Sequence, residues 1–166
     1  MPMLSGRMEL NMNDIKHIMD LLGQKKELFT EYERITNDML TCSVEELEAF
    51  MSRRGELIKE IDAVVRQITE VCEQDDTGLY GQAVKNKCSR SELPEYLVCV
   101  FDFAQTIFAV MNRVANIEPQ IMERLLQCRD ELEQKIKSTN NAPKIAKYLT
   151  TVDPTFEAGT FLNSKK

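Results

Sequence analysis

The sequence predicts an all-α protein. A long antiparallel helical hairpin and a third long helix are expected to form an elongated, coiled-coil-like bundle, followed by an amphipathic C-terminal tail. The strongest observation is a ladder of mostly apolar residues spaced alternately three and four apart, which is typical of a helix packed along another helix. Its members are Leu47, Phe50, Met51, Arg54, Leu57, Ile58, Ile61, Val64, Val65, Ile68 and Val71. Similar stripes precede and follow this ladder, so three long helices are expected.

The first helix is expected over residues 10 to 40, where the same spacing recurs with an interruption at Lys25. Its apolar positions are Ile15, Ile18, Leu22, Phe29, Tyr32, Ile35 and Met39. After a short break, Ser43 and Glu46 match a capping box, in which each side chain satisfies a backbone N–H at the start of the next helix. So short a connection predicts that the second helix, residues 44 to 72, folds back antiparallel to the first.

A polar connection, residues 73 to 91, follows the hairpin and leaves room for a short helix over residues 79 to 87. The third helix is expected over residues 91 to 137, with Pro94 in its first turn, where proline is well tolerated. Pro119 falls inside the same pattern. Because proline lacks a backbone N–H and clashes with the preceding turn, we expect a kink or a break there, with a kink favoured.

Composition and charge argue against several classes of function. A formal net charge of -6 and a pI near 5.0 argue against nucleic-acid binding, which needs clustered Lys and Arg side chains. The longest apolar run, Tyr96 to Phe101, is far shorter than the roughly 20 residues that cross a bilayer, so no stable membrane insertion is expected. Residues 1 to 12 lack the apolar segment of a secretory signal, which predicts a cytoplasmic location.

No residue pattern predicts catalysis, a cofactor or a metal, and the chain is not expected to be an enzyme. His17 is the single histidine, so it cannot supply the paired carboxylate and histidine motifs of a di-iron bundle. The acidic segment from Glu73 to Gly78 starts like a calcium loop, but Val84 stands where the bidentate glutamate belongs, and a solvated turn is expected. The glycines form no phosphate-binding motif. Five cysteines without a C-x-x-C pair indicate neither a disulfide framework nor zinc.

Two features of the helices leave alternatives open. Arg54 interrupts the ladder, either with its head group reaching water or a carboxylate of the first helix, or as a polar group that sets the helical register. The third helix has a broad apolar face, which contacts both hairpin helices or a second subunit, or else forms an open groove for a partner helix. The residues that broaden this face are Val98, Val100, Phe103 and Val110. A homo-oligomer is therefore left open.

The chain is expected to divide into a helical bundle domain, residues 1 to 137, and a flexible amphipathic tail, residues 138 to 166. The tail carries four lysines against Asp153 and Glu157, whereas the chain as a whole is acidic. Its apolar residues have little capacity to fold alone, so they either pack on their own bundle or bind a partner. They are Ile145, Tyr148, Leu149, Val152, Phe156, Phe161 and Leu162.

Three segments resemble the FlgN-type flagellar export chaperones. Residues 43 to 61, SVEELEAFMSRRGELIKEI, are similar to the start of that family's second helix, where an acidic-Leu entry precedes Arg and a Glu-Leu-Ile pattern. Residues 112 to 116, NRVAN, are similar to the asparagine-bearing run before its last helical stretch. Residues 159 to 165 resemble its C-terminal ending, with Asn163 in place of an Asp.

The resemblance implies a cytoplasmic chaperone that binds flagellar hook-filament junction proteins, prevents their premature assembly and hands them to the type III export apparatus. It implies no ATP site and no reaction. A helix of the client would be bound by the apolar tail residues, with the carry-over strongest near Phe161 and Leu162, and the tail would exchange its own contacts for the client's. The alternative is a structural coiled-coil module that dimerises or serves as a scaffold without chaperone activity.

Overall fold

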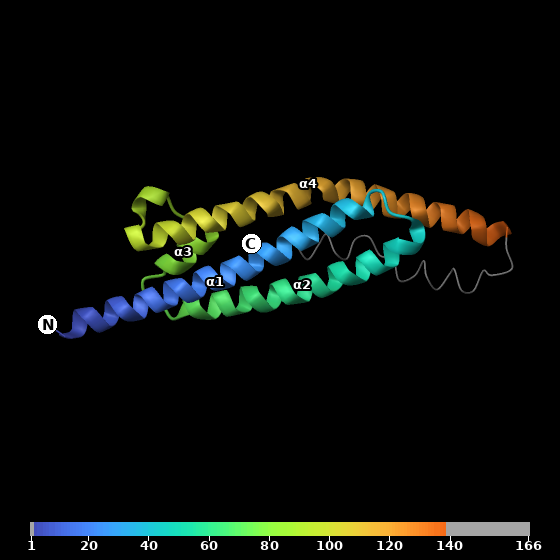
Figure 1. Cartoon of the computed structure of the whole chain (residues 1–166). Helices are drawn as coiled ribbons and strands as arrows, with labels where there is room; N and C mark the ends of the chain where they lie inside the picture. The colour runs from blue at the N-terminus through green and yellow to red at the C-terminus, as the bar shows by residue number, and fades with distance from the viewer. Residues whose placement is uncertain (1, 139–166) are drawn as a thin grey trace. The chain divides into compact units, whose positions relative to one another are not determined.

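A computed structural model describes the backbone of residues 2 to 138 and the side chains of residues 12 to 138. Within these residues the regular elements are all helices, which confirms the predicted all-α class (Figure 1). The three long helices are α1 (Pro2–Met39), α2 (Val44–Glu73) and α4 (Glu95–Ser138). A short helix α3 (Leu79–Lys85) and a 3-10 turn η1 (Arg90–Glu92) lie between α2 and α4 in the chain.

The connection between α1 and α2 is built as the capping pattern predicts. The N–H of Ser43 donates to Oε2 of Glu46 at 3.2 Å, and the N–H of Glu46 donates to Oγ of Ser43 at 3.3 Å. These reciprocal bonds satisfy two N–H groups that a helix start leaves without intrahelical partners. Just before them, the N–H of Cys42 donates to the carbonyl of Asp38 at 3.0 Å and closes the last turn of α1.

The start of α1 lies earlier than predicted. The helix begins at Pro2 instead of near Leu10. Proline suits the first position of a helix because its φ angle is already helical and its missing N–H would have had no partner there. Apolar periodicity therefore predicted the helix but not its first residue.

The start of α4 lies later than predicted. The helix begins at Glu95 instead of near Ser91, because η1 and an extended residue come first. Leu93 has φ -84° and ψ 144°, which is the extended conformation imposed on a residue that precedes a proline. Pro94 therefore separates η1 from α4, and its carbonyl accepts the N–H of Leu97 at 2.9 Å in the first turn of α4.

Pro119 does not break α4, so the predicted alternative of a break was wrong. The helix is continuous from Glu95 to Ser138 with Pro119 inside it. A proline cannot donate to the carbonyl four residues earlier, here that of Ala115. Both Ala115 and Pro119 are exposed, so water can satisfy that carbonyl and the helix can continue.

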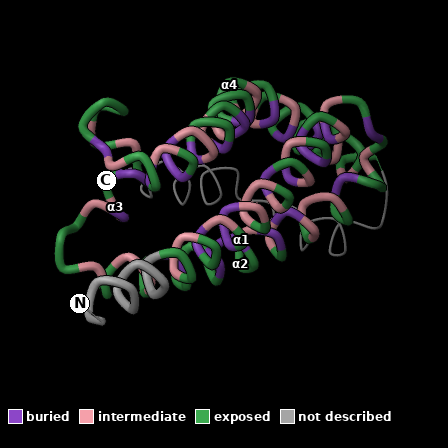
Figure 2. Tube along the Cα trace, turned by 60° about the vertical axis from the view of Figure 1, so that its left-hand side comes forward, coloured by how far each residue is buried: buried purple, intermediate pink, exposed green. Residues whose placement is uncertain are grey.

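The chain forms two compact units, and each takes segments from α1, α2 and α4. Unit 1 consists of Met1–Glu33 and Glu56–Arg113, which also include α3 and η1. Its core is apolar and runs along the inner faces of its helices (Figure 2). The buried residues are Ile18, Leu21, Leu22, Phe29, Tyr32, Leu57, Ile61, Val64, Ile68, Tyr80, Ala83, Leu93, Leu97, Val100, Phe101, Ala104, Ile107 and Val110.

Unit 2 consists of Arg34–Gly55 and Val114–Lys166, of which the structure describes residues 34 to 55 and 114 to 138. It contains the turn between α1 and α2 and the C-terminal part of α4. Its core differs from that of unit 1 because two polar side chains, Thr36 and Arg54, are buried in it. The apolar members are Ile35, Met39, Cys42, Leu47, Val114, Ile121, Leu125 and Cys128.

Helix α4 is, by length and composition alone, apolar enough to cross a membrane, as core helices of soluble proteins also are. In unit 1 much of its apolar surface is taken up by packing, since Leu97, Val100 and Ile107 are buried there. Of the residues expected to broaden its apolar face, Val100 and Val110 are buried, while Val98 and Phe103 are half-buried. Part of the apolar surface of α4 is therefore buried by packing within unit 1.

Candidate functional site

The apolar tail residues predicted to bind a client lie outside the described residues. They are Ile145, Tyr148, Leu149, Val152, Phe156, Phe161 and Leu162. The last described element before them is α4, which ends at Ser138. Among the described residues, those nearest in sequence to the tail lie at the C-terminal end of α4, which belongs to unit 2.

The apolar seam of unit 2 continues along α4 beyond its fully buried part. Its buried members are spaced three, four or seven residues apart and thus share one face of the helix: Val114, Ile121, Leu125 and Cys128. Leu132 and Ile136 continue the same spacing, but both are only half-buried. Leu126 lies on another face and is 40% exposed. The end of α4 therefore presents an apolar stripe that the described residues of its unit cover incompletely.

The hairpin ends before α4 does. Arg54, on α2, pairs with Glu118 of α4, and further along α4 the guanidinium of Arg124 donates through Nη2 to the carbonyl of Cys42, in the turn between α1 and α2. Helix α4 therefore runs toward this turn, and its C-terminal end continues past it (Figure 1). The residues of α4 that follow its last buried member, Cys128, are 129 to 138. We call these residues the overhang. At about 1.5 Å per residue the overhang is about 15 Å long.

The most buried charge of unit 2 is Arg54, whose side chain is 1% exposed. Its Nη2 donates to Oε1 of Glu118 at 2.5 Å, and its Nη1 lies 3.5 Å from Sδ of Met39. Because a buried charge is costly without a partner, the carboxylate of Glu118 stabilises the guanidinium at this position. Arg54 does not reach water, so that expectation was wrong, and the carboxylate of Glu118 belongs to α4.

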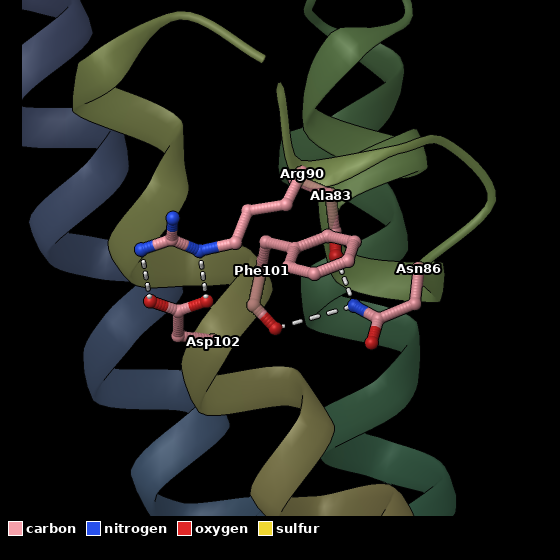
Figure 3. A network of polar contacts seen from close by, with 5 residues as sticks. All are labelled: Ala83, Asn86, Arg90, Phe101 and Asp102. Atoms are coloured by element: carbon pink, nitrogen blue, oxygen red, sulfur yellow. Dashed lines mark hydrogen bonds and ion pairs between the residues drawn. The ribbon is translucent and has the colours of Figure 1, made fainter. Parts of the chain in front are cut away.

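A polar network in unit 1 fixes α3 and η1 against α4 (Figure 3). The Arg90 guanidinium donates to both carboxylate oxygens of Asp102, from Nε at 2.9 Å and from Nη2 at 3.1 Å. The hydrogen bond from Arg90 lowers the pKa of Asp102, and the same bond raises the pKa of Arg90. Both groups are well exposed, so the pair orients η1 on α4 more than it stabilises the fold.

Asn86 makes the part-buried hydrogen bonds of this network. Its side-chain Nδ2 donates to the carbonyl of Ala83 at 2.9 Å and to the carbonyl of Phe101 at 3.2 Å, and the second bond links α3 to α4. Its backbone has φ 52° and ψ 38°, the left-handed conformation that commonly ends a helix. Asparagine adopts this conformation more readily than most residues that have a Cβ atom, so both its backbone and its amide suit the position.

The acidic segment before α3 is a capped turn. Oδ1 of Asp75 accepts the N–H of Thr77 at 3.1 Å and its hydroxyl at 2.7 Å, and Oδ2 accepts the N–H of Tyr80 at 3.0 Å. Burial acts to raise the pKa of Asp75, but the hydrogen bonds from Tyr80 and Thr77 outweigh it and lower the pKa. The carboxylate therefore serves as a cap for the first turn of α3.

Two further contacts join α4 to α1 within unit 1. The Arg113 guanidinium donates from Nε to Oε1 of Glu33 at 2.7 Å and from Nη2 to Oε2 at 3.1 Å. This hydrogen-bonded ion pair raises the pKa of Arg113. The ammonium of Lys26 lies 5.3 Å from the centre of the Phe103 ring, within the range of a cation–π interaction. These contacts position α4 against α1 within unit 1.

The described residues contain no group of three or more His, Cys, Asp or Glu side chains that could hold a metal ion. His17 is exposed on α1. All five cysteines are free thiols, of which Cys42 and Cys128 are buried and Cys99 is exposed. Burial raises the pKa of Cys128 and of Cys72, which disfavours the nucleophilic thiolate.

Sequence reasoning overlooked Glu118, although a signal for it was present. Glu118 stands four residues after Val114 and three before Ile121, which is a seam position of α4. A charged residue on the seam of one helix and Arg54 on the seam of another indicate a buried pair. The roles of Asn86, Arg90 and Asp102 left no comparable signal, because they depend on how α3 returns to α4.

No protein-family model, curated protein or solved structure matches this chain. The resemblance to FlgN-type chaperones therefore rests on the three sequence segments that suggested it.

Proposed function

We propose that this protein is a non-enzymatic export chaperone that binds an amphipathic helix of a flagellar hook-filament junction protein. It keeps that helix from assembling before the client reaches the type III export apparatus. The class of client comes from the sequence resemblance. The mode of binding comes from the end of α4 and from the apolar residues that follow it in the chain.

The observation that carries the proposal is the overhang of α4. Leu132 and Ile136 continue a buried apolar seam but remain half-buried past the turn of the hairpin. An amphipathic helix with apolar residues at matching intervals would complete the packing that α1 and α2 provide elsewhere. The apolar residues from Ile145 to Leu162 follow directly in the sequence and would close over the same client helix.

This arrangement suits reversible capture. A client helix buries its apolar face on the chaperone, and that is the face through which it would otherwise assemble with other subunits. Ordering a terminal segment during binding consumes part of the interaction free energy, which keeps the complex strong enough to form and weak enough to release. Neither step needs a nucleotide or a covalent intermediate.

The test uses the full-length chain and a purified hook-filament junction protein, with binding followed by calorimetry. Replacement of Phe161 and Leu162 by Asp is expected to weaken binding by at least about tenfold, because two apolar contacts are lost. Replacement of the exposed Leu126 by Asp is the matched control and is expected to leave binding unchanged. Unchanged binding in the first variant would reject the tail as the client-binding segment.

The competing function is a structural module that dimerises through the broad face of α4. In unit 1 the half-buried Val98 and Phe103 are the residues that such an interface would use. Light scattering on the full-length chain separates the two functions. A stable dimer that dissociates when Phe103 is replaced by Asp, together with no affinity for the junction protein, would favour the structural module.

A further inference from the structure

We propose that the apolar stripe of the overhang is a docking surface for residues 145 to 152 of the same chain. The surface is formed by Leu132 and Ile136. Both lie on the face of α4 that carries the buried Leu125 and Cys128, since the spacing of three and four residues is maintained. The hairpin covers this face only as far as its turn.

The sequence after α4 has the right pattern to cover the stripe. Ile145, Tyr148, Leu149 and Val152 are spaced three, one and three residues apart, so in a helix they share one face. The distance from the first to the last is about 11 Å along such a helix, which fits within the overhang of about 15 Å.

The connection has a suitable length and composition. Residues 139 to 144 separate the end of α4 from Ile145, and connections of about two to eight residues commonly join antiparallel helices. They include Asn140, Asn141 and Pro143, which favour turns and disfavour continuation of the helix. The segment would therefore return along α4, with Ile145 near Ile136 and Val152 closer to Cys128.

Docking of the segment from the same chain is favoured over docking from a second copy, because the connection raises the effective concentration of the segment at the overhang. A short connection holds the segment near the overhang at about millimolar effective concentration. A second molecule at micromolar concentration would need far higher affinity to compete. The docking would thus be intramolecular and would shield Leu132 and Ile136 in the absence of a partner.

This contact would regulate client binding. Only that regulatory role rests on the proposed function. A client helix that uses the overhang must first displace residues 145 to 152, so weak apolar partners are excluded. The docking itself is a property of the isolated chain. It is therefore tested without any client, and failure to bind a flagellar subunit would leave it unaffected.

The experiment is hydrogen exchange on the full-length chain at low micromolar concentration. In the unmodified chain the amides of residues 145 to 152 are expected to exchange more slowly than in the isolated peptide. Replacement of both Leu132 and Ile136 by Asp is expected to accelerate their exchange by about tenfold or more, since the apolar contacts are lost. Leu126→Asp places the same charge on another face of α4 and is expected to change nothing.

Protection of the amides around Leu47 and Ile121 in every variant shows that unit 2 is still folded. Exchange of residues 145 to 152 at the rate of the isolated peptide in the unmodified chain would overturn the proposal. Protection that increases with protein concentration, together with a dimer mass in light scattering, would also overturn it. That result would assign the stripe to a second copy.

Discussion

Arg54 and Glu118 are 64 residues apart in the sequence, yet Nη2 of Arg54 lies 2.5 Å from Oε1 of Glu118 in the core of unit 2. The two side chains are unequally shielded, with exposures of 1% for Arg54 and 17% for Glu118. A pair that joins α2 to α4 at one level opposes any slip of one helix along the other, because a slip would leave a buried charge without its carboxylate.

The unequal burial predicts unequal costs when either partner is removed. Glu118→Leu leaves the guanidinium of Arg54 buried without this carboxylate and is expected to cost about 3 to 5 kcal/mol of unfolding free energy. Arg54→Met leaves a carboxylate that can turn toward water, so a smaller loss is expected. The double variant is expected to be close to the unmodified chain in stability, since both charges are gone and packing is retained.

Urea unfolding of the four chains measures these differences, with replacement of the exposed Arg113, the partner of Glu33, as the control. Arg113→Met is expected to cost much less than Glu118→Leu, because an ion pair formed by an exposed guanidinium is screened by water and contributes little. Equal losses for Glu118→Leu and Arg113→Met would contradict the assignment of the Arg54 pair as buried and structurally important.

The two hydrogen bonds that the side-chain amide of Asn86 donates predict a ranking of substitutions at this position. Asn86→Gly keeps the left-handed backbone but loses the bonds to Ala83 and Phe101, so a loss of about 1 to 2 kcal/mol is expected. Asn86→Ala also requires a residue with a Cβ atom to stay left-handed, which costs roughly 1 kcal/mol more. Thermal or urea unfolding in which alanine is tolerated better than glycine would contradict this account.

The lowered pKa of Asp75 predicts that the protein loses stability at acid pH. Its pKa is lowered by folding, so the stability that it contributes is present above the ordinary value of 3.8 and is lost as the pH falls through the lower folded value. Asp75→Ala is expected to cost about 1 kcal/mol at neutral pH, as for other caps, and to flatten the acid limb of the stability profile. Asp76 is exposed, and Asp76→Ala is the neighbouring control, with an expected change within about 0.5 kcal/mol.

The raised pKa of Tyr80 predicts that the protein loses stability at alkaline pH. Burial, with smaller contributions from Asp14 and Asp75, raises the pKa of Tyr80 from 10.0 to about 12. Stability from the neutral phenol is therefore fully present below pH 10 and is lost as the pH rises through about 12. Tyr80→Phe cannot ionise, so its unfolding free energy is expected to fall less steeply between these pH values. Parallel profiles for the two chains would show that Tyr80 ionises as freely in the folded state as in the unfolded one.

Local patterns in the sequence were sufficient to predict much of the fold. The capping box at Ser43 and Glu46 formed as expected, and the ladder of α2 packs through Leu57, Ile61 and Ile68. Helix periodicity is a local property that records which face is buried, so the three long helices could be predicted. It did not predict where α1 begins, because the expected stripe starts near Leu10, whereas the helix begins at Pro2.

The tertiary structure decided which groups meet. Whether Arg54 reaches water or is buried depends on the helix that packs over it, and its partner on that helix, Glu118, lies 64 residues further along the chain. The contact between Asn86 and the carbonyl of Phe101 likewise depends on how α3 folds back. Side-chain periodicity determines a helix and its buried face, whereas the partner of a polar group is set by long-range packing. For this protein the sequence by itself determined the helices, and only the tertiary structure revealed the buried ion pair and the overhang of α4.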